Sequence, residues 1–175
     1  MIRWLSLLSM LLSVLLMSCS VPTTAKPPTF MSNQTPASES LGQTLQISGK
    51  AIVPNGTTIQ LEVAQTPAQQ AKGLMYRPAL PDNRGMLFQF PSAQPVSFWM
   101  KNVPVPLDMV FLNKGVVKYI QASAPPCKSE PCPTYGPNTP IDTVIELRSG
   151  RAAELNLKVG DIVKIEFLNS GALQR

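Results

Sequence analysis

The sequence predicts a mainly β protein, a compact antiparallel β-sandwich or barrel with two short helices. Apolar runs of strand length recur along the chain, and turn-forming residues separate them. Eighteen prolines favour loops and strand edges over long helices. Hydrophobic residues make up 44% of the chain and charged residues 14%, a balance typical of a folded domain. Many short strands joined by turns are the pattern of a sandwich or barrel.

The first expected element is a hairpin. Apolar and polar residues alternate over residues 45–47 and again over 59–63, on either side of an Asn55-Gly56 pair. Period-two alternation indicates strands, and Asn-Gly favours the tight turn that joins two of them. The sequence therefore predicts an antiparallel pair at the start of the domain.

A short helix is expected next. Thr66 can cap its first turn, Pro67 suits the first helical position, and Gln69 completes a capping box. We expect this helix to run to about Met75.

Six further apolar runs have the length of strands. They are Met86–Phe90, Val96–Met100, Leu107–Leu112, Val116–Gln121, Thr143–Arg148 and Ile162–Phe167. Residues 113–115, Asn-Lys-Gly, should join two of them as a tight hairpin. Residues 149–157 are expected to form a second short helix that ends before Gly160.

Residues 1–18 predict a bacterial signal peptide. A short basic start precedes an apolar, uncharged run over 4–17, too short for a spanning helix but suited to export. The segment Leu16-Met17-Ser18-Cys19 resembles the lipobox of bacterial lipoproteins. That resemblance implies cleavage before Cys19, lipid on its sulfur, and a protein anchored to a bacterial membrane and facing the periplasm or exterior. The alternative is an ordinary secretory signal followed by a chance cysteine.

The rest of the chain divides by composition. Residues 19–43 are rich in Pro, Ser and Thr and predict a disordered linker behind the lipidated cysteine. Residues 44–168 carry the strand pattern and predict one β domain. Residues 169–175 are left as a C-terminal tail.

Two features of composition narrow the function. Histidine is absent, which excludes Ser-His-Asp and Cys-His catalysis and His-ligated zinc. The formal net charge is +5, but no run of Lys and Arg is present, so we expect no nucleic-acid partner. No motif for a cofactor or metal stands out. The expected partner is the membrane, through Cys19, with a further envelope ligand or protein left unidentified.

Five blocks of sequence carry a family resemblance over residues 44–168. They are Gly73–Arg77, Gly85–Phe88, Phe98–Asn102, Pro106–Asp108, and Val144–Leu147 followed by Gly150 and Gly160-Asp161. In this order and spacing they resemble the domain-of-unknown-function 192 family. The resemblance implies a compact, mostly β fold and no established activity.

The cysteines predict one disulfide. With Cys19 lipidated, Cys127 and Cys132 remain as a pair separated by four residues. An exported chain meets an oxidising compartment, which favours a disulfide that pins the Pro-rich loop around it. The alternative is a redox or metal-binding pair, although two thiolates without histidine make only half a zinc site.

Two carboxylates lie in strands that are otherwise apolar. Asp108 and Glu146 would be costly to bury unless paired, and Arg77 is the expected partner because its guanidinium can engage a carboxylate with two bonds. The structural interpretation, which we favour, is a buried ionic network. The functional alternative is a ligand cleft in which both carboxylates act as acid and base in an envelope hydrolase, with Trp99 as a sugar platform.

The sequence also allows a recognition patch and a copper site. Trp99 beside Lys101 and Asn102 predicts a binding surface if its ring points outward, and core if it points inward. Met75, Met86, Met100 and Met109 could offer thioethers to Cu(I), but methionine is also a common core filler.

The sequence thus favours a membrane-tethered, non-enzymatic binding or accessory module of the cell envelope. The alternatives are the hydrolase and the copper-binding protein. The binding candidates are Arg77, Trp99, Lys101, Asn102, Asp108 and Glu146, of which Asp108 and Glu146 are weak catalytic candidates.

Overall fold

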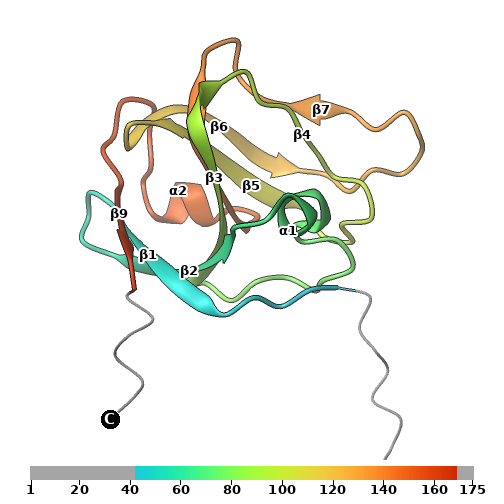
Figure 1. Ribbon diagram of the computed structural model, residues 1–175, viewed down its shortest axis with the longest axis horizontal. Coiled ribbons are helices and arrows are strands. Elements are labelled where there is room, and N and C mark those ends of the chain that lie inside the picture. Colours follow the sequence, from blue (N-terminus) through green and yellow to red (C-terminus); the bar gives the residue numbers. More distant parts are fainter. Residues whose placement is uncertain (1–41, 169–175) are drawn as a thin grey trace, which may run out of the picture. The chain divides into compact units, whose positions relative to one another are not determined.

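The computed structural model describes residues 42–168 (Figure 1). It confirms a mainly β fold, with a seven-stranded sheet, a two-stranded sheet and two short helices. The predicted signal peptide, Cys19, nearly all of the linker and the C-terminal tail lie outside the described residues.

The elements follow one another closely along the chain. They are β1 (Ile47–Ile52), β2 (Thr58–Ala64), α1 (Pro67–Lys72), β3 (Arg84–Gln94), β4 (Phe98–Trp99), β5 (Leu107–Asn113), β6 (Val116–Ala124), β7 (Thr134–Tyr135), β8 (Ile141–Arg148), α2 (Arg151–Glu154) and β9 (Lys164–Phe167). Neither helix in this part of the chain is long and apolar enough to cross a membrane.

The main sheet has the order β6-β5-β8-β3-β2-β1-β9, and β4 pairs with β7 in the small sheet. All strand pairs are antiparallel except β2 with β3, which is parallel. A parallel pair needs a crossover connection, and the segment that contains α1 supplies it. The expected hairpin around Asn55-Gly56 forms from β1 and β2.

The main sheet curls until its two edges meet at one end. Val116 at the start of β6 forms an isolated bridge with Ile162, just before β9. The amide of Val117 donates to the carbonyl of Asp161 at 2.9 Å, and the amide of Val163 donates to that of Gly115 at 2.8 Å. The sheet is therefore partly closed, between a sandwich and a barrel.

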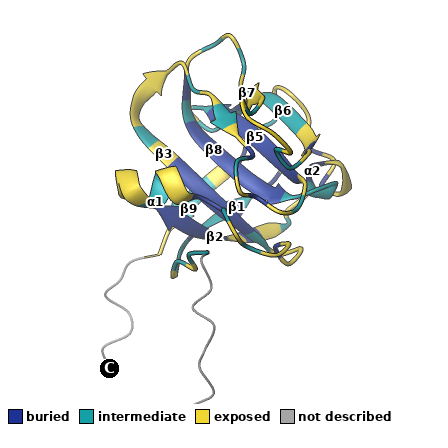
Figure 2. Cartoon of the chain, turned by 90° about the vertical axis from the view of Figure 1, so that its right-hand side faces the viewer, coloured by how far each residue is buried: buried dark blue, intermediate teal, exposed yellow. Residues whose placement is uncertain are grey.

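The central strands of the main sheet are largely buried, as their dark colour in Figure 2 shows, and two apolar clusters pack on the sheet. One face packs against α2, through residues such as Leu61, Val110 and Leu155. The other face holds Phe88 and Phe111 in a second cluster that includes residues following α1 and β4. Burial on both faces explains why strands such as β5 are apolar almost throughout.

The first helix forms as predicted and then stops early. The Thr66 hydroxyl accepts from the Gln69 amide at 3.2 Å, and the Gln69 side chain accepts from the Thr66 amide at 3.0 Å. The helix ends at Lys72 rather than near Met75, because Gly73 has φ of +46° and breaks the helical path.

Candidate functional site

Three carboxylates among residues 42–168 are buried in the main sheet, and they differ in which groups compensate their negative charge. Glu62, Asp108 and Glu146 are 2%, 0% and 5% exposed. A buried carboxylate is costly unless hydrogen bonds or a cation compensate it. The fold supplies that compensation to two of the three.

Asp108 in β5 is satisfied by backbone amides. Its Oδ1 accepts from Ser123 at 2.8 Å and from Gly150 at 3.1 Å, and its Oδ2 accepts from Ala152 at 2.8 Å. Gly150 and Ala152 belong to the first turn of α2, whose unpaired amides favour a negative charge. Asp108 therefore caps a helix from a neighbouring strand, an architectural task that needs no arginine.

Glu62 in β2 is the partner of Arg77. The two guanidinium nitrogens Nη1 and Nη2 donate to its carboxylate oxygens at 2.7 and 3.0 Å, and the amide of Leu45 donates to Oε2 at 2.8 Å. The expectation that Arg77 pairs with Asp108 or Glu146 is wrong. The predicted buried Arg–carboxylate pair exists, but with a different carboxylate.

Asp108 and Glu146 lie on opposite faces of the sheet. In the register of β5 with β8, Asp108 is opposite Leu147 and Met109 is opposite Glu146. Directly opposed residues point to the same face and successive residues to opposite faces. The sheet therefore separates the two carboxylates, and they cannot act as an acid and base on one substrate.

Glu146 in β8 is the carboxylate that the fold leaves open. Its register neighbours are Met86 in β3 and Met109 in β5, and Oε2 has no hydrogen-bond partner among residues 42–168. Burial without a compensating cation raises the pKa of Glu146 from 4.5 to about 8. At neutral pH the group is therefore mostly a carboxylic acid.

Glu146 lines a pocket of about 380 Å³. The pocket lies over the sheet face opposite to α2, and residues of α1 and of the segment that includes β4 contribute to its walls. Its lining combines aromatic and aliphatic side chains with polar ones such as Gln70, Gln94 and Ser97, and it includes two lysines. The charged and aromatic residues of the lining include Lys72, Phe88, Phe98, Trp99, Lys101 and Glu146.

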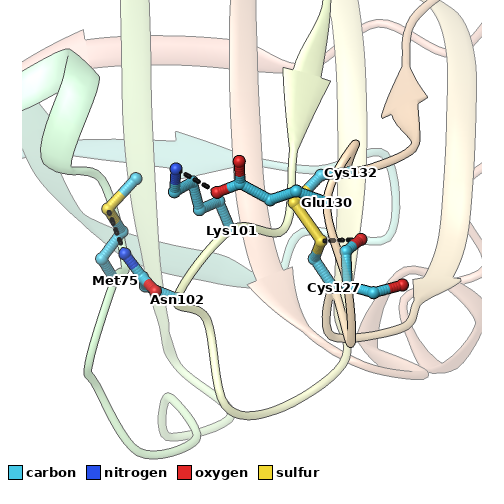
Figure 3. The surroundings of a disulfide bond; sticks show 7 residues. Met75, Lys101, Asn102, Cys127, Glu130 and Cys132 are labelled. Atoms are coloured by element: carbon cyan, nitrogen blue, oxygen red, sulfur yellow. Dashed lines mark hydrogen bonds and ion pairs between the residues drawn. A yellow bond between two sulfur atoms is a disulfide. The ribbon is translucent and has the colours of Figure 1, made fainter.

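Two residues of the predicted recognition patch, Trp99 and Lys101, line the pocket, whereas Asn102 is not part of its lining. Trp99 is 49% exposed, and the Lys101 ammonium lies 5.6 Å from the centroid of its ring. Lys101 also forms an ion pair with Glu130, between the two disulfide cysteines (Figure 3). Asn102 is exposed and its side-chain amide contacts the Met75 sulfur at 4.0 Å.

The predicted disulfide is present between Cys127 and Cys132. The loop that it closes carries Glu130 and so holds an anion beside Lys101 (Figure 3). The disulfide thus supports one side of the pocket mouth.

The methionines serve mainly as core. Met86, Met100 and Met109 are at most 1% exposed within the apolar cluster below the pocket, and Met75 is packed against it. Among residues 42–168 no group of three His, Cys, Asp or Glu side chains is placed to hold a metal ion.

Sequence reasoning missed Glu62 and most of the pocket wall. Glu62 occupies a polar position in the alternating pattern of β2 and was not singled out, yet the structure buries it. Lys72 and Phe98 gave no separate signal, because their convergence with Glu146 depends on how three distant segments pack. The sequence signals that correctly pointed to the pocket were the acid in an apolar strand, Glu146, and the neighbouring Trp99 and Lys101.

The chain is similar to one protein family and to solved structures from two bacteria. The chain matches the DUF192 family, described as Uncharacterized ACR, over residues 50–165. A solved structure from Sinorhizobium meliloti 1021, described as a candidate transcription regulator, is 33% identical; the match covers 70% of this chain and 97% of that one, with a TM-score of 0.59.

A second solved structure, a protein of unknown function from Novosphingobium aromaticivorans DSM 12444, is 36% identical. The match covers 69% of this chain and 86% of that one, again with a TM-score of 0.59. No curated protein matches the chain. The family match spans residues 50–165, which include every residue that lines the pocket, and the chain belongs to the DUF192 family.

Proposed function

We propose that this protein is a lipid-anchored binding module of the bacterial envelope, which takes a small ligand into the pocket above Glu146. One observation carries the proposal. A carboxyl group that is 5% exposed lines a pocket of about 380 Å³, and one of its oxygens has no partner in the described chain. A ligand would supply the missing partner.

The contrast with the other two carboxylates strengthens the argument. Asp108 receives three amide donors and Glu62 receives two guanidinium bonds. Buried polar groups in folded proteins are nearly always paired, so an exception that faces a pocket is a typical mark of a binding site.

Binding is favoured over hydrolysis because the site offers one carboxyl group. The second carboxylate that glycoside hydrolysis requires, Asp108, lies on the other side of the sheet and is occupied by backbone amides. The remaining charged groups of the pocket are Lys72 and Lys101.

The anchor rests on the lipobox-like Leu16-Met17-Ser18-Cys19. The disulfide between Cys127 and Cys132 fits this location, since disulfides persist in oxidising compartments. The expected place of action is a bacterial membrane, on the side that faces the periplasm or the exterior.

The pocket is tested with toluenesulfonate, a small probe that has an aromatic body for the walls and an anion for the lysines. Ala71 lies in α1, is exposed and lines the pocket, so Ala71→Phe should narrow it without disturbing the core. Ala68 is exposed in the same helix and outside the pocket lining, which makes Ala68→Phe the matched control.

We expect calorimetric titration of the detergent-solubilised full chain to show saturable binding. Ala71→Phe should weaken it by about tenfold or more, and Ala68→Phe should leave it unchanged. Equal binding to both variants would place the probe elsewhere and refute the pocket as the site.

A further inference from the structure

We propose that the ligand is a small zwitterion with an apolar body, whose ammonium group binds Glu146 and whose anionic group binds beside Lys72 and Lys101. This inference rests on the proposed function and specifies its ligand class. Among the residues that line the pocket, Glu146 is a buried carboxyl group of the sheet, Phe88 and Phe98 supply aromatic rings, and Lys72 and Lys101 supply two cations at more exposed positions.

The sheet side of the pocket favours an ammonium group. Oε2 of Glu146 has no donor from the described chain, and its register neighbours Met86 and Met109 carry no charge. An alkylammonium would give the carboxylate both a hydrogen-bond donor and the countercharge that Arg77 gives to Glu62. A cation thus completes the one buried carboxylate that the fold leaves incomplete.

The aromatic lining favours the same group and an apolar body. Phe88 and Phe98 meet edge to face, with ring centroids 5.1 Å apart, and Trp99 stands at the mouth. The faces of aromatic rings attract cations, and their area favours contact with a hydrocarbon chain. A purely polar ligand would leave this lining unused.

The mouth favours an anion. Lys72 forms no ion pair with any residue between 42 and 168, and Lys101 shares its charge with Glu130. Two ammonium groups would repel a ligand that carries only a positive charge. A ligand with an anion at its other end is attracted instead.

Binding of such a ligand is coupled to proton release. Burial raises the pKa of Glu146 to about 8, so below that pH an arriving ammonium must displace the proton. The other charged groups that face this region are Lys72 from α1, Lys101 after β4, and the Glu62–Arg77 pair beyond Met86. The variant Glu146→Gln separates their effect from that of Glu146.

The experiment compares three probes of similar length: ε-aminocaproate, caproate and hexylamine. Each is titrated calorimetrically into the detergent-solubilised full chain between about pH 6 and about pH 9. An alkylammonium with an ordinary pKa of about 10.4 stays charged over this range. Toluenesulfonate serves as the independent probe of the pocket.

We expect ε-aminocaproate to bind at least about tenfold more tightly than either single-charge probe. Its affinity should rise about tenfold per pH unit below pH 8 and then level, with release of about one proton per ligand at pH 7. Glu146→Gln should abolish the pH dependence and lower the affinity at about pH 9. Lys72→Gln should remove the advantage of ε-aminocaproate over hexylamine, whereas Lys118→Gln, an exposed position outside the pocket, should not.

The outcomes separate the two proposals. If toluenesulfonate binds in the pocket but ε-aminocaproate binds no better than caproate, or its affinity falls with rising pH, the ligand class is wrong and the binding function stands. A ligand that accepts a hydrogen bond from the protonated acid would give that falling profile. If no probe binds, both proposals fail.

Discussion

Glu146 shows how a single side chain sets both stability and recognition. Its pKa is raised from 4.5 to about 8 by burial, so between these values the folded state holds a proton that the unfolded chain has released. The free energy of unfolding therefore falls as pH rises through this window, by about 1.4 kcal/mol per pH unit, and the full loss is present above pH 8.

Glu146→Gln should remove this contribution. We expect the variant to be more stable than the wild type at about pH 9 and to lose that advantage progressively towards about pH 5. Urea unfolding of both proteins at a series of pH values measures the difference and cancels titrations that they share. Parallel profiles would mean that Glu146 is solvated in the folded protein.

At the scale of single residues, the sequence predicted which carboxylates are buried better than it predicted which groups pair with them. An acid in an apolar strand correctly marked Asp108 and Glu146 as buried. Their partners depend on strand register and parity, since one step along a strand moves a side chain to the other face. Arg77 could therefore be recognised as a buried cation while its mate, Glu62, was missed.

At the scale of elements, α2 depends on a residue that is distant in sequence. The helix spans only Arg151–Glu154, and its N-cap residue, Gly150, has no side chain to cap it. Asp108 supplies the cap from β5 and ties the helix to the sheet and to Ser123 in β6. The docking of α2 is thus built on one carboxylate.

Asp108→Ala should destabilise the protein by about 3 kcal/mol or more, because three amides, one of them in a buried hydrogen bond and two in part-buried ones, lose their acceptor. Asp108→Asn keeps one acceptor oxygen and should cost less. Asp142 accepts one amide, that of Lys114 at 2.7 Å, at a more exposed position, so Asp142→Ala should cost about 1 kcal/mol. Thermal unfolding of the three variants checks the order, and an Asp108→Ala variant as stable as the wild type would contradict it.

The elements themselves were predicted where local chemistry determines them. The capping box of α1 and the hairpin around Asn55-Gly56 formed as expected. Strand β7, of two residues, was missed because only its pairing with β4 makes it a strand. The run over 96–100 contracted to β4 for the same reason, since little of it has a strand beside it.

For the molecule as a whole, the fold class followed from the density of short apolar runs. The parallel pairing of β2 with β3 did not, because it depends on the crossover through α1.

Cys19→Ser tests the anchor. We expect the wild-type protein to fractionate with membranes and to incorporate radiolabelled palmitate. The Cys19→Ser variant should lose the label and enter the soluble fraction. Cys127→Ser is the matched control, since it also removes a cysteine yet should keep the label. Labelling of the Cys19→Ser variant would mean that the lipid is attached at another residue, and would refute Cys19 as the anchor.

The bridge between Val116 and Ile162 has a consequence for molecules crowded on a surface. An open sheet edge presents unpaired amides and carbonyls that can recruit a strand of another copy, and tethering to a membrane raises the frequency of such encounters. Here β6 and the segment before β9 occupy part of each other's edge. The curled sheet thereby reduces its own capacity to template aggregation, a property that would suit the membrane-tethered protein that we propose.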